Sequence, residues 1–159
     1  MSAVETLSPP LVGDQLDRIA ADLQPTLLEL IDLSLLAKQA HWNVTGPLFR
    51  PLHQQFDELA EATRTWSDDV AERLLAVGVP AEGRATSVAA GTRLEAVPAG
   101  RLDGRDAVRL VAERLAEVAR RVTARVQRLE ELDALSQDVL VEVGRGLEKQ
   151  LWMLREQVA

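Results

Sequence analysis

The chain has 159 residues, of which 47% are hydrophobic, 27% are charged and only 3% are aromatic. This length suffices for one domain with its own core, which aliphatic side chains must fill. The absence of cysteine excludes disulfides, thiolate metal sites and cysteine nucleophiles, and a net charge of −7 argues against nucleic acid as the default partner.

Residues 1–12 are predicted to form a flexible tail, because Pro9-Pro10 blocks a helix. The first ten residues lack the basic start and the apolar stretch of a signal peptide. No apolar run in the chain is long enough to span a bilayer. These features predict a cytoplasmic protein without membrane contact, folded as a single domain over residues 13–159.

Four long amphipathic helices are predicted from apolar residues that recur at i, i+3, i+4 and i+7. The first begins at Asp14 and ends near Asn43, and Pro25 is expected to kink or split it. The second runs from about Phe49 to Val77, where Gly78 and Pro80 end it. The third and fourth cover about residues 105–132 and 136–158. No strand is predicted.

Residues 78–104 form a long connection between the second and third helices, and a short helix is predicted near residues 86–96. Asp103 or Asp106 is expected near the N-cap of the third helix. So long a crossover favours parallel second and third helices rather than a hairpin. The sequence therefore predicts an all-α, ferritin-like four-helix bundle whose crossover carries a short helix.

The second helix carries a stripe of potential metal ligands. His53 and Asp57 form one i, i+4 pair, and Asp68 and Glu72 form another. On a helical wheel the four fall within about 100°, on a side that does not face the bundle's own interior. His41, near the end of the first helix, can lie beside His53. The alternative interpretation is a solvated acidic face.

The two pairs are too far apart to bind one ion within a chain. Asp57 and Asp68 lie roughly 16 Å apart along the helix, whereas a ligand atom lies about 2 Å from its metal. An antiparallel copy of the helix across a twofold axis brings the His53 end of one chain to the Glu72 end of the other. Nitrogen and oxygen ligands suit iron, zinc or manganese without selecting among them. No Glu-x-x-His motif occurs, which argues against a di-iron site inside the bundle.

Two stretches, DLSLLAKQAHWNVTGPLFRPLHQQFDEL and DDVAERLLAVGVP, resemble the Dps family, the DNA-binding proteins from starved cells or miniferritins. The EKQLW stretch near the carboxy end is similar as well. The resemblance implies a four-helix bundle that assembles as a hollow homododecamer. It also implies a cytoplasmic ferroxidase that oxidises Fe(II), preferentially with hydrogen peroxide, stores Fe(III) mineral and protects against oxidative stress.

The resemblance assigns five ferroxidase ligands, contributed by two subunits across a twofold axis: His41, His53, Asp57, Asp68 and Glu72. Trp42 is interpreted as interface packing in preference to a redox role, and Trp66 and Trp152 as packing. The family also has an acidic iron-entry pore. Its candidates here are Asp133, Asp138 and Glu142, for which the alternative is a carboxylate favoured at a helix start.

DNA binding is expected to be weak or absent. Members of the family that bind DNA tightly usually have lysine-rich tails, whereas the first basic residue here is Arg18. One face of the third helix carries several arginines flanked by glutamates, which we interpret as a solvated, salt-bridged face; the arginines are Arg114, Arg121, Arg125 and Arg128.

There are two alternatives to the ferroxidase function. One is a nucleoid-associated, DNA-compacting protein with secondary ferroxidase activity, and the other is a shell that has lost this activity. The intact ligand set argues against the second alternative.

Overall fold

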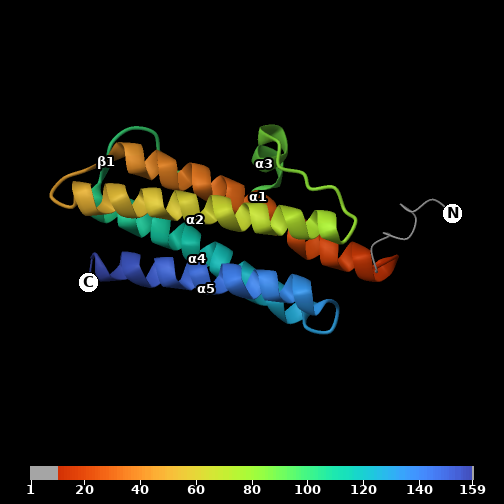
Figure 1. Cartoon of the computed structure of the whole chain (residues 1–159). Helices are drawn as coiled ribbons and strands as arrows, with labels where there is room; N and C mark the ends of the chain where they lie inside the picture. Colours follow the sequence, from red (N-terminus) through yellow and green to blue (C-terminus); the bar gives the residue numbers. More distant parts are fainter. Residues whose placement is uncertain (1–10, 159) are drawn as a thin grey trace.

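Four long helices run along one another in the computed structural model, which describes residues 11–158 (Figure 1). Their bounds are α1 Asp14–Asn43, α2 Phe49–Ala76, α4 Gly104–Leu129 and α5 Ala134–Glu156, and the short α3, Ala85–Gly91, lies in the crossover. α1 and α2 are antiparallel neighbours, as are α4 and α5, while α2 and α4 run in the same direction. The predicted bundle and crossover are confirmed. Most of the predicted tail, residues 1–10, lies outside the described residues.

The core forms because apolar side chains repeat along one face of each helix. In α2, Leu52, Phe56, Leu59, Val70 and Leu74 are fully buried, as the periodicity predicts. The opposite side of α2 is left to polar residues, and this is the side that carries the ligand stripe. Within residues 11–158, no helix is long and apolar enough to cross a membrane.

The prediction that no strand occurs is wrong in one place. β1 (Val44–Thr45) pairs in parallel with β2 (Leu102–Asp103), Val44 opposite Leu102 and Thr45 opposite Asp103. Segments of two residues are too short to produce a period-2 signal. The pairing holds the end of the crossover beside the start of α2. Asp103 then caps α4 by accepting a 3.0 Å hydrogen bond from the Arg105 amide.

Pro25 does not split α1, which is continuous from Asp14 to Asn43. A proline inside a helix removes one hydrogen bond and costs about 3 kcal/mol. The surrounding turns contain Leu23, Leu27 and Leu30, all buried in the core. Burying one leucine side chain contributes roughly 1.5–3 kcal/mol, so packing on both sides of the proline outweighs its cost.

The arginine face of α4 is salt-bridged, as predicted, but two of its four arginines are buried rather than solvated. Arg114 and Arg125 are only 5% and 6% exposed. Arg125 donates to Glu29 of α1 at 2.6 Å and Arg121 donates to the same carboxylate at 3.0 Å. Arg128 pairs with Asp22 of α1 at 2.6 Å. The flanking Glu113 and Glu117 pair with Arg114 and Arg121 as predicted. The sequence did not indicate the carboxylates of α1, because they are distant in the chain.

Candidate metal centre

His41 and His53 face each other where the end of α1 meets the start of α2. Their rings are stacked, with centroids 3.7 Å apart. His41 Nδ1 lies 2.6 Å from the His53 backbone oxygen, and His53 Nδ1 lies 2.9 Å from the His41 backbone oxygen. A carbonyl oxygen can only accept, so each Nδ1 is the donor in these contacts, and in a neutral imidazole Nε2 is then the nitrogen that keeps its lone pair. The arrangement presents two imidazole nitrogens in the form that binds a metal ion.

Asp57 lies one turn after His53 on α2. Its Oδ1 accepts a 2.5 Å hydrogen bond from Lys38 Nζ. This hydrogen bond, together with the charges of Lys38, His41 and His53, outweighs desolvation and lowers the pKa of the Asp57 carboxyl below its usual 3.8. Asp57 is therefore a carboxylate at neutral pH, so the end of the bundle combines two imidazoles with one carboxylate.

Asp68 and Glu72 lie further along α2, exposed on the same side of the helix. They are more than two turns from Asp57, as the sequence requires. Within residues 11–158 of one chain, no three histidine or carboxylate side chains come together as a metal site. The candidate ligands of one chain thus fall into two separate sets, neither of which forms a metal site by itself. We call His41, His53 and Asp57 the first half-site, and Asp68 and Glu72 the second.

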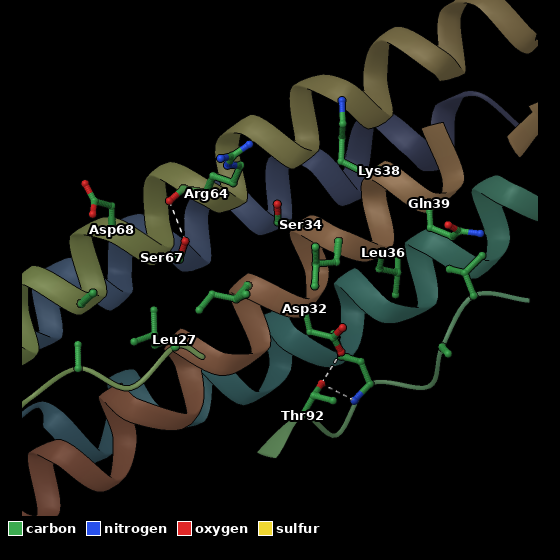
Figure 2. A pocket seen from close by; sticks show the side chains of 18 of the residues that line it. Leu27, Asp32, Ser34, Leu36, Lys38, Gln39, Arg64, Ser67, Asp68 and Thr92 are labelled. Carbon is green, nitrogen blue, oxygen red and sulfur yellow. Dashed lines mark hydrogen bonds between the residues drawn. The ribbon is translucent and has the colours of Figure 1, made fainter. Parts of the chain in front are cut away.

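A groove of about 1030 Å³ lies between α1, α2 and the crossover (Figure 2). Lys38, which pairs with Asp57 of the first half-site, and Asp68 of the second half-site both line it. Its other lining is largely apolar and includes Leu35 and Trp42, whose side chains are 59% and 66% exposed. An exposed apolar surface of this kind is typical of a protein interface. It connects the two half-sites of a chain.

The crossover that forms one wall of this groove is fastened to α1 and α4. Gln24 and the backbone of Glu82 exchange hydrogen bonds of 2.7 and 3.0 Å. Thr92 donates to Asp32, and Arg114 of α4 donates to Glu95. A Cβ at Gly91 would lie 2.5 Å from Leu28, so glycine allows α3 to approach α1 closely. The groove is therefore built by contacts that sequence reading did not identify.

The three pore candidates differ in their surroundings. Asp133 is the N-cap of α5, where its Oδ2 accepts from the Ser136 amide at 3.0 Å and from Arg73 of α2 at 2.6 Å. Asp133 therefore fits the alternative to the pore role, a carboxylate that is favoured at the start of a helix. Asp138 and Glu142 are exposed and lie one turn apart on α5, which leaves them available to solvent.

The tryptophans also differ. Trp42 is exposed at the groove. Trp66 packs against the core and against Gly146, where a Cβ would lie 2.1 Å from its ring, so its predicted packing role is confirmed. Trp152 is 59% exposed within the single chain, so its packing role stays a prediction. The sequence places each tryptophan on a helix. Its surroundings depend on which other helix packs against that position.

Sequence reasoning missed two basic residues beside the half-sites. Lys38 lies three positions before His41, and Arg73 lies directly after Glu72. The spacing of Lys38 from His41 is a helical i, i+3 signal that could have placed both on one face of α1. For Arg73 no local signal exists, because its partner Asp133 is 60 positions away.

Comparisons with known proteins agree with this geometry. Residues 20–159 match the Ferritin family model, described as a ferritin-like domain. DNA protection during starvation protein 2 of Deinococcus radiodurans is 37% identical over 150 residues, which cover 94% of this chain and 62% of that protein. The chain thus spans less than two thirds of that relative. The DNA protection during starvation protein of Agrobacterium fabrum is 33% identical, covering 86% and 85% of the two chains.

Solved structures give the same result. The crystal structure of Dps92 from Deinococcus radiodurans superposes with a TM-score of 0.89 and 37% identity, covering 91% of this chain and 87% of that one. Dps from Microbacterium arborescens in its high-iron form gives a TM-score of 0.89 and 30% identity, covering 94% and 98%. Fold and sequence similarity extend over nearly the whole described chain. The chain therefore belongs to the Dps family of ferritin-like proteins.

Proposed function

We propose that this protein is a miniferritin, which oxidises Fe(II) at centres shared between two subunits and stores the Fe(III) product inside a homododecameric shell. The observation that carries the proposal is the stacked histidine pair, in which each Nδ1 contacts a backbone oxygen and Nε2 is the ring nitrogen left to bind a metal. The carboxylate of Asp57 lies beside them. Imidazole and carboxylate are suitable ligands for iron, which is here the substrate.

The chemistry follows from the ligand set. Carboxylates stabilise Fe(III) more than Fe(II) because the higher charge attracts the anionic oxygens more strongly. With hydrogen peroxide as the oxidant, two Fe(II) supply two electrons, the O–O bond breaks, and two protons complete two molecules of water. Pairing the electrons in this way avoids the hydroxyl radical that a single-electron transfer to peroxide releases. The proposed preference for peroxide and the protection against oxidative stress rest on this step.

The partner is a second copy of the chain. The groove beside the half-sites leaves Leu35 and Trp42 exposed, and Leu75 is exposed at the far end of the stripe on α2. A copy related by a twofold axis covers these side chains and brings its Asp68 and Glu72 to His41, His53 and Asp57. Trp42 packs in this interface. Asp138 and Glu142, with Asp133 at the base of α5, form the proposed acidic entry for iron.

A mixing experiment tests the shared centre. One variant lacks the first half-site through His41→Ala, His53→Ala and Asp57→Ala, and another lacks the second through Asp68→Ala and Glu72→Ala. Each alone is expected to form inactive shells. When both are unfolded, mixed equally and refolded, half of the dimers are mixed, and each mixed dimer has one intact centre of two. Roughly a quarter of wild-type ferroxidase activity is expected to return.

The matched control carries Glu58→Ala and Asp69→Ala, which remove two exposed carboxylates of α2 outside the stripe. It is expected to keep full activity before and after refolding. Light scattering verifies that all refolded samples have the mass of the wild-type shell. No recovery of activity in well-mixed shells of correct mass would contradict the shared centre and the assignment of Asp68 and Glu72.

A further inference from the structure

Two exposed charges lie on α2 between the two half-sites. Arg64 and Glu61 form an ion pair of 3.9 Å within the chain, and their side chains are 69% and 68% exposed. It is the longest ion pair within residues 11–158, and a contact of this length between exposed side chains contributes little to stability. Arg64 is also the only cationic side chain between Asp57 and Asp68. The single chain therefore gives neither charge a strong partner.

Glu61 and Arg64 belong to the same stripe of α2 as the candidate ligands. On a helical wheel with His53 at zero, Arg64 falls at about 20° and Glu61 at about 80°, inside the range of about 100° that the ligands cover. Arg64 also lines the groove together with Asp68 (Figure 2). A second chain that covers the two half-sites must therefore cover these two charges as well.

The proposed centre fixes how two copies of α2 align. In an antiparallel pair of helices related by a twofold axis, residues that face each other lie at equal distances on either side of the axis. Positions 53 and 72 are centred between positions 62 and 63, and so are positions 57 and 68. Positions 61 and 64 are centred on the same point. The register that joins the half-sites therefore sets Glu61 opposite Arg64 of the partner subunit.

We propose that Glu61 forms an ion pair with Arg64 of the partner subunit, and that the two symmetric pairs select the register in which the half-sites meet. This inference rests on the proposed function. A shift of about one helical turn in one direction would set Glu61 opposite Asp68 of the partner subunit, and two facing carboxylates repel each other. Attraction in one register and repulsion in the next together make the alignment of the two chains specific.

Two complementary charge reversals test the pair between chains. Glu61→Arg leaves a chain with two cations at these positions, and Arg64→Glu leaves a chain with two carboxylates, so neither chain keeps its internal pair. Each variant alone is expected to associate across the twofold axis at least about tenfold more weakly than the wild type, because like charges face each other. An equal mixture, refolded together, is expected to assemble as the wild type does, since opposite charges then face each other.

Glu58→Arg is the matched control, because it makes the same change of charge at an exposed position of α2 outside the stripe. It is expected to assemble normally. Circular dichroism verifies that every variant is helical, and sedimentation measures assembly without iron. No gain in assembly when the two folded variants are mixed, or wild-type assembly of each alone, would overturn the proposal. A mixture that assembles but does not oxidise Fe(II) would support the ion pair and contradict the proposed centre.

A chain that carries both reversals gives a second test, which also serves if a single reversal fails to fold. This chain keeps an internal pair and is expected to assemble with itself. Refolded with an equal amount of wild type, it sets like charges against each other in every mixed dimer. Mass spectrometry of the dissociated dimers is expected to find mixed dimers at least about tenfold below the half that random pairing gives. Random pairing of the two chains would show that the contact lies within each chain, which would overturn the proposal.

Discussion

Between α4 and α5, one oxygen of Asp133 serves two donors, the Ser136 amide and the Arg73 guanidinium. Burial raises the pKa of the Asp133 carboxyl, but the hydrogen bonds from Ser136 and Arg73 outweigh it, and the pKa is lowered from 3.8. A carboxyl whose pKa is lower in the folded state stabilises the fold above its unfolded pKa. That contribution is lost as the pH falls through the folded value.

Asp133→Asn is therefore expected to reduce stability at pH 7 by about 1–2 kcal/mol, because asparagine can still cap α5 but cannot pair with Arg73. The difference from wild type should shrink as the pH falls below about 4. Thermal unfolding between pH 7 and pH 3 measures it. Asp106→Asn, which breaks the exposed pair with Arg109, serves as the control and should change little at any pH. Equal stability of Asp133→Asn and wild type at pH 7 would contradict this account.

The packing of α1 against α4 depends on charge as well as on apolar area. Glu29 is 1% exposed and accepts hydrogen bonds from Arg121 and Arg125. Arg125 also donates to Thr26, which is fully buried. A buried ion pair contributes little compared with an apolar pair of the same shape, but removing one partner leaves an uncompensated charge in the interior. The surfaces of α1 and α4 are thus complementary in charge as well as in shape.

Glu29→Gln is expected to destabilise the protein by about 3–5 kcal/mol, because Arg125 stays buried without its counter-charge. The melting temperature should fall by roughly 10 °C at equal protein concentration. Glu117→Gln is the matched control: it removes the other carboxylate beside Arg121, at a site where both side chains are partly exposed. It should cost less than about 1 kcal/mol. Similar losses of stability in Glu29→Gln and Glu117→Gln would show that burial of the ion pair does not determine the size of the loss.

At the scale of the whole molecule, charge limits what the surface can bind. The net charge is −7. The face of α4 that collects arginines is turned towards α1, where Asp22 and Glu29 neutralise it. Binding to DNA depends on the number of phosphates that free cations can neutralise. Because these arginines are already paired with carboxylates, this face is a poor candidate for a phosphate-binding surface.

We expect the assembled protein to form no stable complex with linear DNA in a gel shift at physiological salt. Lowering the salt concentration should increase any residual association steeply, as for a non-specific electrostatic contact. Deleting residues 1–12 is the control for the amino-terminal segment and should leave the result unchanged. Complexes that persist at physiological salt after this deletion would reveal a DNA-binding surface elsewhere on the shell.

Several features of this protein could be read from the sequence because they depend on residues close together in the chain. Apolar periodicity predicted the four helices and the buried positions of α2, such as Leu52 and Phe56. The i, i+4 spacing placed His53 and Asp57 on one side of α2 and showed that Asp68 was too distant to share an ion within the chain. Helical geometry repeats every 3.6 residues, so local order determines which residues share a face.

Other features were decided only when distant segments met. Val44 pairs with Leu102 and Thr45 with Asp103 in the two short strands, and Glu29 meets Arg125 across 96 positions. The contacts of the histidine Nδ1 atoms with backbone oxygens, and of Lys38 with Asp57, depend on the register between α1 and α2. That register is set by how the side chains of two helices interdigitate, a property of both surfaces together. For this reason the sequence could predict which residues are candidate ligands, while the tertiary structure determined which contacts their side chains make.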